Sequence, residues 1–334
     1  MPQRVALNVT NTSWQHALAD CITDPQELFA LLKLPTESLP AAQRAATLFP
    51  LRVPRSYLAR IEPGNPTDPL LLQVLPLHAE FDNPPDFIHD PVGDLLGLNA
   101  PGLLQKYHGR ALVIATGACA IHCRYCFRRH FPYDEHGARK NRWQETMDYL
   151  AAHSDIDEVI LSGGDPLSLS DDRLASWCRD LAGLPQLRRV RIHTRLPIVV
   201  PERITSGLLA ALKQVAQPIV CVVHANHGNE LSTDVAVALR KLRDSGVHLL
   251  NQSVLLKGVN DDATTLRQLS ERLFDLGVLP YYLHVLDKVA GAAHFDVPDA
   301  IARDLHEALM AQLPGYLVPR LVRESVGAPN KLPL

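Results

Sequence analysis

Residues 119–126 read Cys-Ala-Ile-His-Cys-Arg-Tyr-Cys, which places three thiols, separated by three and then two residues, shortly after the apolar run 111–115. The three cysteines are Cys119, Cys123 and Cys126. Thiolates are the usual protein ligands of iron–sulfur clusters, so these thiols can bind three irons of a cubane and leave the fourth open. Zinc, with His122 or His130 as a further ligand, stays an alternative. The stretch predicts a metal centre on a loop that follows a strand.

The composition limits the class of protein. The chain has 334 residues, of which 46% are hydrophobic, enough for a substantial core in one large or two smaller domains. The cysteines outside the motif, Cys21, Cys178 and Cys221, are expected to be buried hydrophobic residues rather than disulfide partners. No apolar run reaches the ~20 residues of a membrane helix, and no secretory signal is recognisable, so we expect a cytoplasmic protein without a membrane partner. The formal net charge of −3 argues against nucleic acid as a partner.

The first hundred residues differ in pattern from the rest. Helices are expected within about residues 12–60, where Asp24 can cap a helix that begins with proline. Prolines recur in residues 63–91, and because proline fixes φ and removes a donor, we expect an ordered loop or linker there. We therefore predict an N-terminal helical and proline-rich region, 1–100, followed by a second domain, 101–334.

In the second domain, short β-branched runs alternate with longer amphipathic segments. Strands are expected at residues 110–116, 158–162, 189–194, 218–223, 247–254 and 280–285. Helices are expected at residues 143–153, 171–182, 203–215, 233–245, 262–276 and 298–312. After the first interval the strands recur roughly every 30 residues, the length of a βαβ unit in a parallel sheet. Six such units fit a partial barrel, with its chemistry at the carboxyl ends of the strands, and they also fit a doubly wound sheet.

Polar residues follow several of these strands. Gly163 and Gly164, after the second, let the backbone approach a ligand closely, although such a pair is also usual in a plain turn. Arg195, after the third, can bind a carboxylate through two parallel hydrogen bonds. His224 and Asn226 end the fourth strand, where a lone histidine is more often a core residue than a ligand. These side chains are candidates for one pocket.

The cysteine spacing, with Tyr125 before the last cysteine, resembles the signature of the radical S-adenosylmethionine (SAM) superfamily. Further stretches narrow the resemblance to lysine 2,3-aminomutase and its relatives, from about Pro63 to the last residue. They are residues 106–110 (Lys-Tyr-His-Gly-Arg), 126–129 (Cys-Phe-Arg-Arg) and 322–331 (Val-Arg-Glu-Ser-Val-Gly-Ala-Pro-Asn-Lys). The resemblance implies an α/β fold, namely a radical-SAM partial (β/α)6 barrel with a mainly helical N-terminal region. It also implies a [4Fe-4S] cluster, S-adenosyl-L-methionine and pyridoxal 5′-phosphate (PLP).

The resemblance also implies a role for each matching position. SAM would be contacted by Tyr125, Ser162, Gly163, Gly164, Asp165, Arg195 and His224. PLP would be carried by the catalytic Lys331 and contacted by Lys106, Tyr107, Arg110 and Gln252. The substrate would meet Arg128 at its α-carboxylate, and Asp287 and Glu324 at its distal ammonium. One guanidinium suits an anion and two carboxylates suit a cation, whereas by residue type alone Lys331 and the two acids would be ordinary surface charges.

The implied reaction is the isomerisation of L-α-lysine to (R)-β-lysine. The implied branch of the family is the bacterial one that supplies β-lysine for modification of translation elongation factor P by a separate ligase. A reductant protein such as a flavodoxin or ferredoxin, and a homo-oligomeric assembly, are implied with it. Two departures predict a reshaped pocket: Glu324 stands where the lysine-catabolic members usually have aspartate, and residues 327–330 read Gly-Ala-Pro-Asn where those members have glycines.

Other functions stay open from the sequence. A 2,3-aminomutase for another amino acid such as arginine would also suit two carboxylates, whereas glutamate would bring a further anion against them. A cluster- or zinc-stabilised scaffold without catalysis is an alternative from a different class. A radical methyltransferase is a third, but it leaves Lys331 unexplained.

Overall fold

The computed structural model describes residues 13–136 and 142–334. A ten-stranded sheet forms its centre, in which β3 to β9 run parallel and β1, β2 and β10 are antiparallel additions at the edges. The strands are β1 (Leu98–Ala100), β2 (Leu103–Tyr107), β3 (Arg110–Thr116), β4 (Glu158–Gly163), β5 (Arg189–Thr194), β6 (Ile219–His224), β7 (His248–Val254), β8 (Leu279–His284), β9 (Arg320–Arg323) and β10 (Leu332–Pro333). Their order in the sheet follows the sequence, as in a partial barrel, which excludes the doubly wound alternative.

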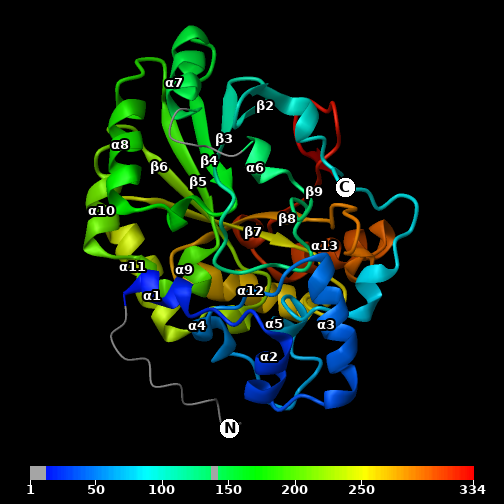
Figure 1. Cartoon of the computed structure of the whole chain (residues 1–334). Helices are drawn as coiled ribbons and strands as arrows, with labels where there is room; N and C mark the ends of the chain where they lie inside the picture. Colours follow the sequence, from blue (N-terminus) through cyan, green and yellow to red (C-terminus); the bar gives the residue numbers. More distant parts are fainter. Residues whose placement is uncertain (1–12, 137–141) are drawn as a thin grey trace.

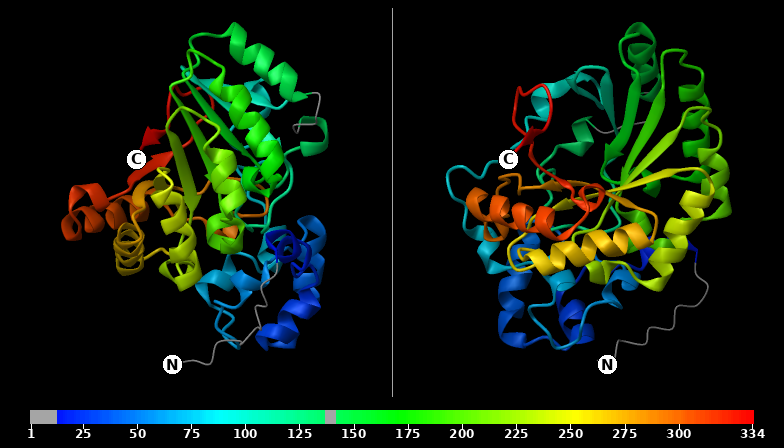
Figure 2. Two further views of the ribbon diagram at one scale, coloured as in Figure 1. Left: turned by 90° about the vertical axis from the view of Figure 1, so that its left-hand side faces the viewer. Right: turned by 180° about the vertical axis from the view of Figure 1, so that it is seen from behind.

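Helices alternate with the parallel strands and cover the outer side of the sheet (Figure 1). The longer ones are α7 (Arg142–Ala152), α8 (Asp171–Ala182), α10 (Ser206–Leu212), α11 (Thr233–Asp244), α12 (Ala263–Asp275) and α13 (Asp299–Gln312). Figure 2 shows α12 and α13 side by side. Short helices follow two strand ends and the cysteine loop: α6 (Tyr133–His136), η4 (Pro166–Ser168) and α9 (Leu196–Val199). The remaining turns of 3-10 helix in this part are η5 (Pro201–Arg203), η6 (Gly228–Glu230), η7 (Ala293–Phe295) and η8 (Gly315–Leu317).

The predicted strands and helices of this part are confirmed. Their observed ends differ by at most one residue from the predicted ones, except for α10. That helix begins three residues later than the predicted 203–215, because Thr205 caps its start by accepting a hydrogen bond from the amide of Leu208 at 3.1 Å, and it ends three residues earlier, at Leu212. The sequence pattern missed β9, a seventh parallel strand, and the hairpin of β1 and β2, since such short segments show little periodicity.

The N-terminal region is helical, as predicted. Its elements are α1 (Trp14–Ala19), α2 (Pro25–Leu32), η1 (Thr36–Ser38), α3 (Leu39–Leu48), α4 (Arg55–Leu58), α5 (Pro69–Leu72), η2 (His78–Phe81) and η3 (Leu95–Gly97). Buried Leu28 and Tyr57 belong to the same hydrophobic cluster as Val113 and Ile192 of the sheet, so packing is continuous across residue 100. The domain boundary placed there stays a prediction. Within the described ranges, no helix is both long and apolar enough to cross a bilayer.

The proline-rich segment 63–91 is more structured than predicted. The expectation of a loop without helical elements is wrong at α5 and η2. Asp68 caps α5 by accepting hydrogen bonds from the amides of Leu70 and Leu71 at 2.7 and 3.0 Å, and Pro69 occupies the first position, where its missing donor costs nothing. Prolines in this segment therefore start helical turns as well as prevent them.

The same segment forms hydrogen bonds with the cysteine loop through Glu80 and Gln73. Glu80 in η2 is fully buried and accepts hydrogen bonds from Nε of Arg124 at 2.7 Å and from a guanidinium nitrogen of Arg129 at 2.7 Å. The amide of Arg124 also donates to the carbonyl of Gln73 at 2.9 Å. Because both arginines lie within three residues of the motif's last cysteine, Cys126, the N-terminal region fixes the backbone that carries the thiols.

We expect Glu80→Gln to destabilise the protein by about 3–5 kcal/mol, because it leaves two arginines on a buried amide in place of a carboxylate. The free energy of unfolding from urea titration measures the loss. Asp86→Asn is a matched control in the same segment, since the Asp86 carboxylate pairs with Lys288 at the surface and its removal is expected to change stability little. Equal unfolding midpoints for the two variants would contradict the structural role of Glu80.

Candidate active site

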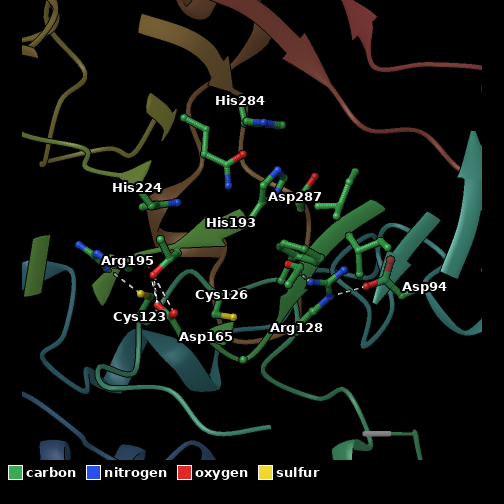
Figure 3. Close-up of a pocket in the computed structure, with 18 of the residues that line it drawn as sticks. Asp94, Cys123, Cys126, Arg128, Asp165, His193, Arg195, His224, His284 and Asp287 are labelled. Carbon is green, nitrogen blue, oxygen red and sulfur yellow. Dashed lines mark hydrogen bonds and ion pairs between the residues drawn. The ribbon is translucent and has the colours of Figure 1, made fainter. Parts of the chain in front are cut away.

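A cavity of about 290 Å³ lies at the carboxyl ends of the parallel strands. The structure brings the residues predicted for the cluster, SAM, PLP and substrate into its lining. These residues are Cys119, Cys123, Cys126, Tyr125, Arg128, Ser162, Gly163, Gly164, Asp165, Arg195, His224, Gln252, Lys106, Tyr107, Arg110, Asp287, Glu324 and Lys331. By contrast, Asn226, the other candidate at the end of β6, is fully buried outside the lining and donates to the Tyr125 hydroxyl at 2.7 Å. In Figure 3, Cys123 and Cys126 lie toward one end of the cavity and His284 toward the other.

The cysteines lie on an irregular loop after β3. The amide of Cys126 donates to the carbonyl of Cys123 at 3.0 Å, which turns the chain between the last two thiols. Burial raises the pKa of the Cys126 thiol to about 11, so metal binding must displace its proton. In the described parts of the chain, no three histidine, cysteine, aspartate or glutamate side chains gather around a point that could hold one metal ion. The donor set itself, three thiols, is of the type that binds iron–sulfur clusters.

The chain after β4 presses against this loop. The amides of Gly164 and Asp165 donate to the carbonyls of Thr116 and Ala118 at 2.7 and 2.8 Å. Gly163 has φ +111°, a conformation that L side chains rarely adopt, and a Cβ on Gly164 would lie 2.5 Å from the carbonyl oxygen of Ala118. The sequence predicted that these glycines allow a close backbone approach to a ligand. In the structure they allow a close approach to the cysteine loop.

Asp165 ties the end of β4 to the end of β5. Its buried carboxylate accepts hydrogen bonds from the Thr194 hydroxyl at 2.7 Å and from the Arg195 amide at 2.8 Å. Burial raises the pKa of Asp165 to about 6, against the lowering effect of these donors. The carboxylate is thus engaged by the protein and orients the backbone of Arg195.

The Arg195 guanidinium points at the cysteine loop. One nitrogen donates to the Cys123 sulfur at 2.6 Å and the other to the Glu230 carboxylate at 2.8 Å (Figure 3 shows the contact with Cys123). Beside it, the Tyr125 hydroxyl lies 2.9 Å from Nε2 of His224, and the two rings stack at 5.7 Å. Burial and then the charge of Arg195 lower the pKa of His224 to about 3, so the imidazole is neutral.

A chain of alternating charges occupies the other end of the cavity. Asp94 accepts hydrogen bonds from Nε of Arg128 at 2.6 Å and pairs with Nζ of Lys106 at 2.5 Å. Lys106 also pairs with Glu324 at 3.1 Å, and the second oxygen of Glu324 pairs with Lys331 at 2.5 Å. Burial raises the pKa of Glu324, but Lys331 and Lys106 outweigh it and lower the pKa to about 2. Glu324 is therefore ionised at neutral pH.

Asp287 is the acid at this end whose charge is least compensated. Its side chain forms no ion pair or hydrogen bond with any residue that the structure describes. Burial and then the nearby charge of Glu324 raise the pKa of Asp287 to about 7, although Lys331 and Lys106 act in the opposite direction. A cation that entered the cavity here would stabilise the ionised form of Asp287.

Several polar groups that face the cavity lack partners. The buried hydroxyl of Tyr107 and the buried Nε2 of His193 have none among the described residues. The Arg110 guanidinium lies over the Tyr107 ring at 5.0 Å and forms no ion pair within the same residues. Buried polar atoms are normally hydrogen-bonded, so these groups suit a polar, anionic ligand.

The sequence reasoning missed some residues of the site. Asp94, His193, Tyr282 and His284 line the cavity, and Glu230 stands behind Arg195. His193 and His284 lie at strand ends, where the same rule that selected His224 would have found them. Asp94 and Glu230 lie outside the strands, and neither belongs to a recognisable motif.

The fold and the site define a class of enzyme. The superfamily model described as "Radical SAM superfamily" matches residues 113–269, which include the cysteine loop and the strands from β4 to β7. This part of the chain is a radical SAM domain, and the radical SAM family implies a [4Fe-4S] cluster and S-adenosyl-L-methionine.

Comparison with individual relatives narrows the class. The chain is 51% identical over 336 residues to "L-lysine 2,3-aminomutase" of Escherichia coli (strain K12), covering 100% of this chain and 98% of that one. It is 49% identical to the protein of that name from Haemophilus influenzae, covering 96% and 94% of the two chains. With the Clostridium subterminale protein of the same name the identity is 32%, covering 96% and 77%. The chain therefore belongs to the lysine 2,3-aminomutase family and is an isomerase.

We expect Gly164→Ala to weaken iron binding on anaerobic reconstitution by roughly tenfold or more. The new Cβ would meet the carbonyl of Ala118 at 2.5 Å, so the cysteine loop would have to shift. Iron and sulfide content per chain measures the effect. Gly315→Ala is the control, because a Cβ there meets nothing within 4 Å. Iron contents that agree between the two variants would show that the glycine contact does not shape the loop.

Proposed function

We propose that the protein is a radical SAM, PLP-dependent L-lysine 2,3-aminomutase that converts L-α-lysine to (R)-β-lysine. The observation that supports this most directly is that one cavity holds three thiols at one end, and a lysine beside two carboxylates at the other. The names of the relatives point to the same reaction.

The residues at the end of the cavity that contains Lys331 fit PLP. Lys331 offers the primary amine that an aldehyde needs, and Arg110, which forms no ion pair with the described residues, offers a charge for a phosphate. The Tyr107 hydroxyl, which has no partner among the described residues, and the amide of Gln252 add polar contacts to the same wall. When bound, PLP supplies the carbonyl group that holds the migrating amino group. In this proposal Lys331, Lys106, Tyr107, Arg110 and Gln252 hold it.

The opposite end fits the cluster and SAM. Cys119, Cys123 and Cys126 would ligate the cluster, and the neighbouring Tyr125, His224 and strand ends would contact SAM. When bound, the cluster and SAM would together supply the radical that removes and returns a substrate hydrogen. The protein's part is to exclude water and fix the distance between this end and the substrate, since about 1 Å of misplacement can cost ~100-fold in rate.

The chain's own residues would hold lysine by both ends. Arg128 donates from Nε to Asp94 and from a second nitrogen to the Ser162 hydroxyl at 3.2 Å. Its third nitrogen forms no hydrogen bond within the described residues, so it is available to bind a carboxylate. Glu324 already pairs with the ammonium of Lys331 at 2.5 Å, which supports an alkylammonium group as its ligand. Asp287 would supply the second carboxylate for the distal ammonium.

We further propose that the β-lysine serves the modification of elongation factor P by a separate ligase. The resemblance to the bacterial branch described above supports this, as do the higher identity and more complete coverage for the Escherichia coli relative than for the Clostridium subterminale one. A flavodoxin or ferredoxin as electron donor, a homo-oligomer and a cytoplasmic location belong to the same proposal.

The reconstituted protein is expected to form (R)-β-lysine from L-lysine under anaerobic conditions with SAM, PLP and a reductant. Chiral chromatography of the product checks this. Cys126→Ala and Lys331→Ala should each abolish the product, because each removes a group that holds a required cofactor. Cys178→Ala and Lys257→Ala are matched controls, a buried cysteine and an exposed lysine that do not line the cavity. Absence of β-lysine from protein that binds both cofactors would redirect the assignment to another amino acid, with arginine tested first.

The acid limb of kcat/KM for lysine is expected to have its midpoint at pH 7 or above, because burial and Glu324 raise the pKa of Asp287 to about 7 and PLP on Lys331 would remove one of the cations that lower it. Below that pH the carboxyl group is neutral and attracts the distal ammonium poorly, so kcat/KM should fall about tenfold per pH unit; above it the carboxylate is ionised and the profile should level off. Rates measured between pH 5.5 and 8.5 test this. In Asp287→Asn the fall of kcat/KM at low pH should disappear. If the fall is unchanged in that variant, a group other than Asp287 causes it.

A further inference from the structure

Arg195 stands between a cysteine of the motif and a buried acid. It follows β5 and is 7% exposed. One guanidinium nitrogen donates to the Cys123 sulfur at 2.6 Å. The other donates to Glu230 at 2.8 Å and to the side-chain oxygen of Gln73 at 2.7 Å. The cation is thus shared between a sulfur atom and a carboxylate.

Both ends of this arrangement are fixed by the protein. Glu230 is fully buried, and its second oxygen accepts hydrogen bonds from the amides of Asn226 and His227 at 2.8 and 3.1 Å. At the other end, the backbone amide of Arg195 donates to Asp165. Turning Arg195 toward a free ligand would separate a buried ion pair, a change that typically costs several kcal/mol.

Structural stabilisation alone does not account for this placement. A buried ion pair contributes little net stability because its desolvation offsets the attraction between the charges. The arrangement has a different consequence when Cys123 binds iron, because its sulfur then carries negative charge. A guanidinium donor at that sulfur stabilises the charge, and hydrogen bonds to the ligand sulfurs are among the factors that set the potential of an iron–sulfur cluster.

We propose that Arg195 is a positioning residue for the cluster, which orients the Cys123 thiolate and raises the cluster's reduction potential, while Glu230 limits that increase. Reduction adds one electron to the cluster and so makes it more negative. A fixed cation at a ligand sulfur stabilises the reduced form more than the oxidised form, and a nearby anion does the opposite. The sequence analysis expects Arg195 to contact SAM. Two of its nitrogens are bound to Cys123 and Glu230, so such a contact would be made by Nε, which has no partner among the described residues.

The inference rests on the cluster of the proposed function but not on its amino-acid substrate. It is tested on reconstituted, cluster-loaded protein without SAM or lysine, so failure of the aminomutase assay and failure of this proposal are distinguishable. The measurement is an electrochemical titration of the one-electron couple between the 2+ and 1+ states of the cluster, followed by electron paramagnetic resonance of the reduced form.

In Arg195→Gln the potential is expected to become more negative by about 59 mV or more, a tenfold change in the reduction equilibrium of a one-electron couple. In Glu230→Gln it should become more positive, because Arg195 then loses its counter-charge. Arg195→Lys keeps the positive charge and should stay nearer to the unmodified protein than Arg195→Gln does. The opposite signs separate an electrostatic effect from a general disturbance of the loop.

Arg203→Gln is the matched control. Arg203 is a fully buried arginine that pairs with Asp171 at 2.7 Å and contacts no thiol. Its variant should leave the potential unchanged. Potentials for Arg195→Gln and Glu230→Gln that equal that of the control, or that shift in the same direction, would overturn the proposal. If Arg195→Gln binds no cluster, the sign of the shift in Glu230→Gln decides: a positive shift supports the proposal, and none or a negative one refutes it.

Discussion

The site depends on one backbone-to-backbone contact, that between the segment after β4 and the loop after β3. The cysteine loop has no regular secondary structure, and the turn from Cys123 to Cys126 is a local hydrogen bond that does not reach Cys119. Its shape comes from the carbonyls of Thr116 and Ala118, which are held by the amides of Gly164 and Asp165, and from the grip of Glu80 on the other side. Any side chain at Gly164 would clash with the carbonyl of Ala118, so this backbone contact requires a glycine at that position.

The cavity differs in electrostatic character from end to end. Near the thiols, the Arg195 and Glu230 charges compensate each other, His224 is neutral, and the Asp165 carboxylate is held by hydroxyl and amide donors. At the other end three cations, Lys106, Lys331 and Arg128, alternate with acids. The two ends therefore suit the two ligand types of the proposal: the thiols suit a cluster, and the alternating charges suit a molecule that carries both signs of charge.

The sequence predicted most of the sheet because buried parallel strands give continuous apolar runs, such as that of β3, at regular intervals. It also predicted which residues gather at the cavity, although their individual roles rest on family resemblance and stay predictions. Partners from the proline-rich part were not predictable. Gln73 contacts Glu230, 157 positions away, and Asp94 meets Arg128, 34 positions away. Neither has a local pattern, because a single polar residue in a loop shows no periodicity that reveals its distant partner.

The contact of Lys331 with Glu324 relates cofactor binding to substrate binding. In the structure the Lys331 ammonium neutralises the carboxylate that the proposal assigns to the substrate's distal ammonium. If PLP is carried on that amine, as proposed, Glu324 would keep Lys106 as its ion-pair partner among the described residues, and Asp287 would have none. Two neighbouring carboxylates with one shared cation leave a net negative charge, which is costly when water is excluded. The distal ammonium of lysine would restore the balance, so the proposed PLP on Lys331 would favour binding of the charge that distinguishes lysine from neutral amino acids.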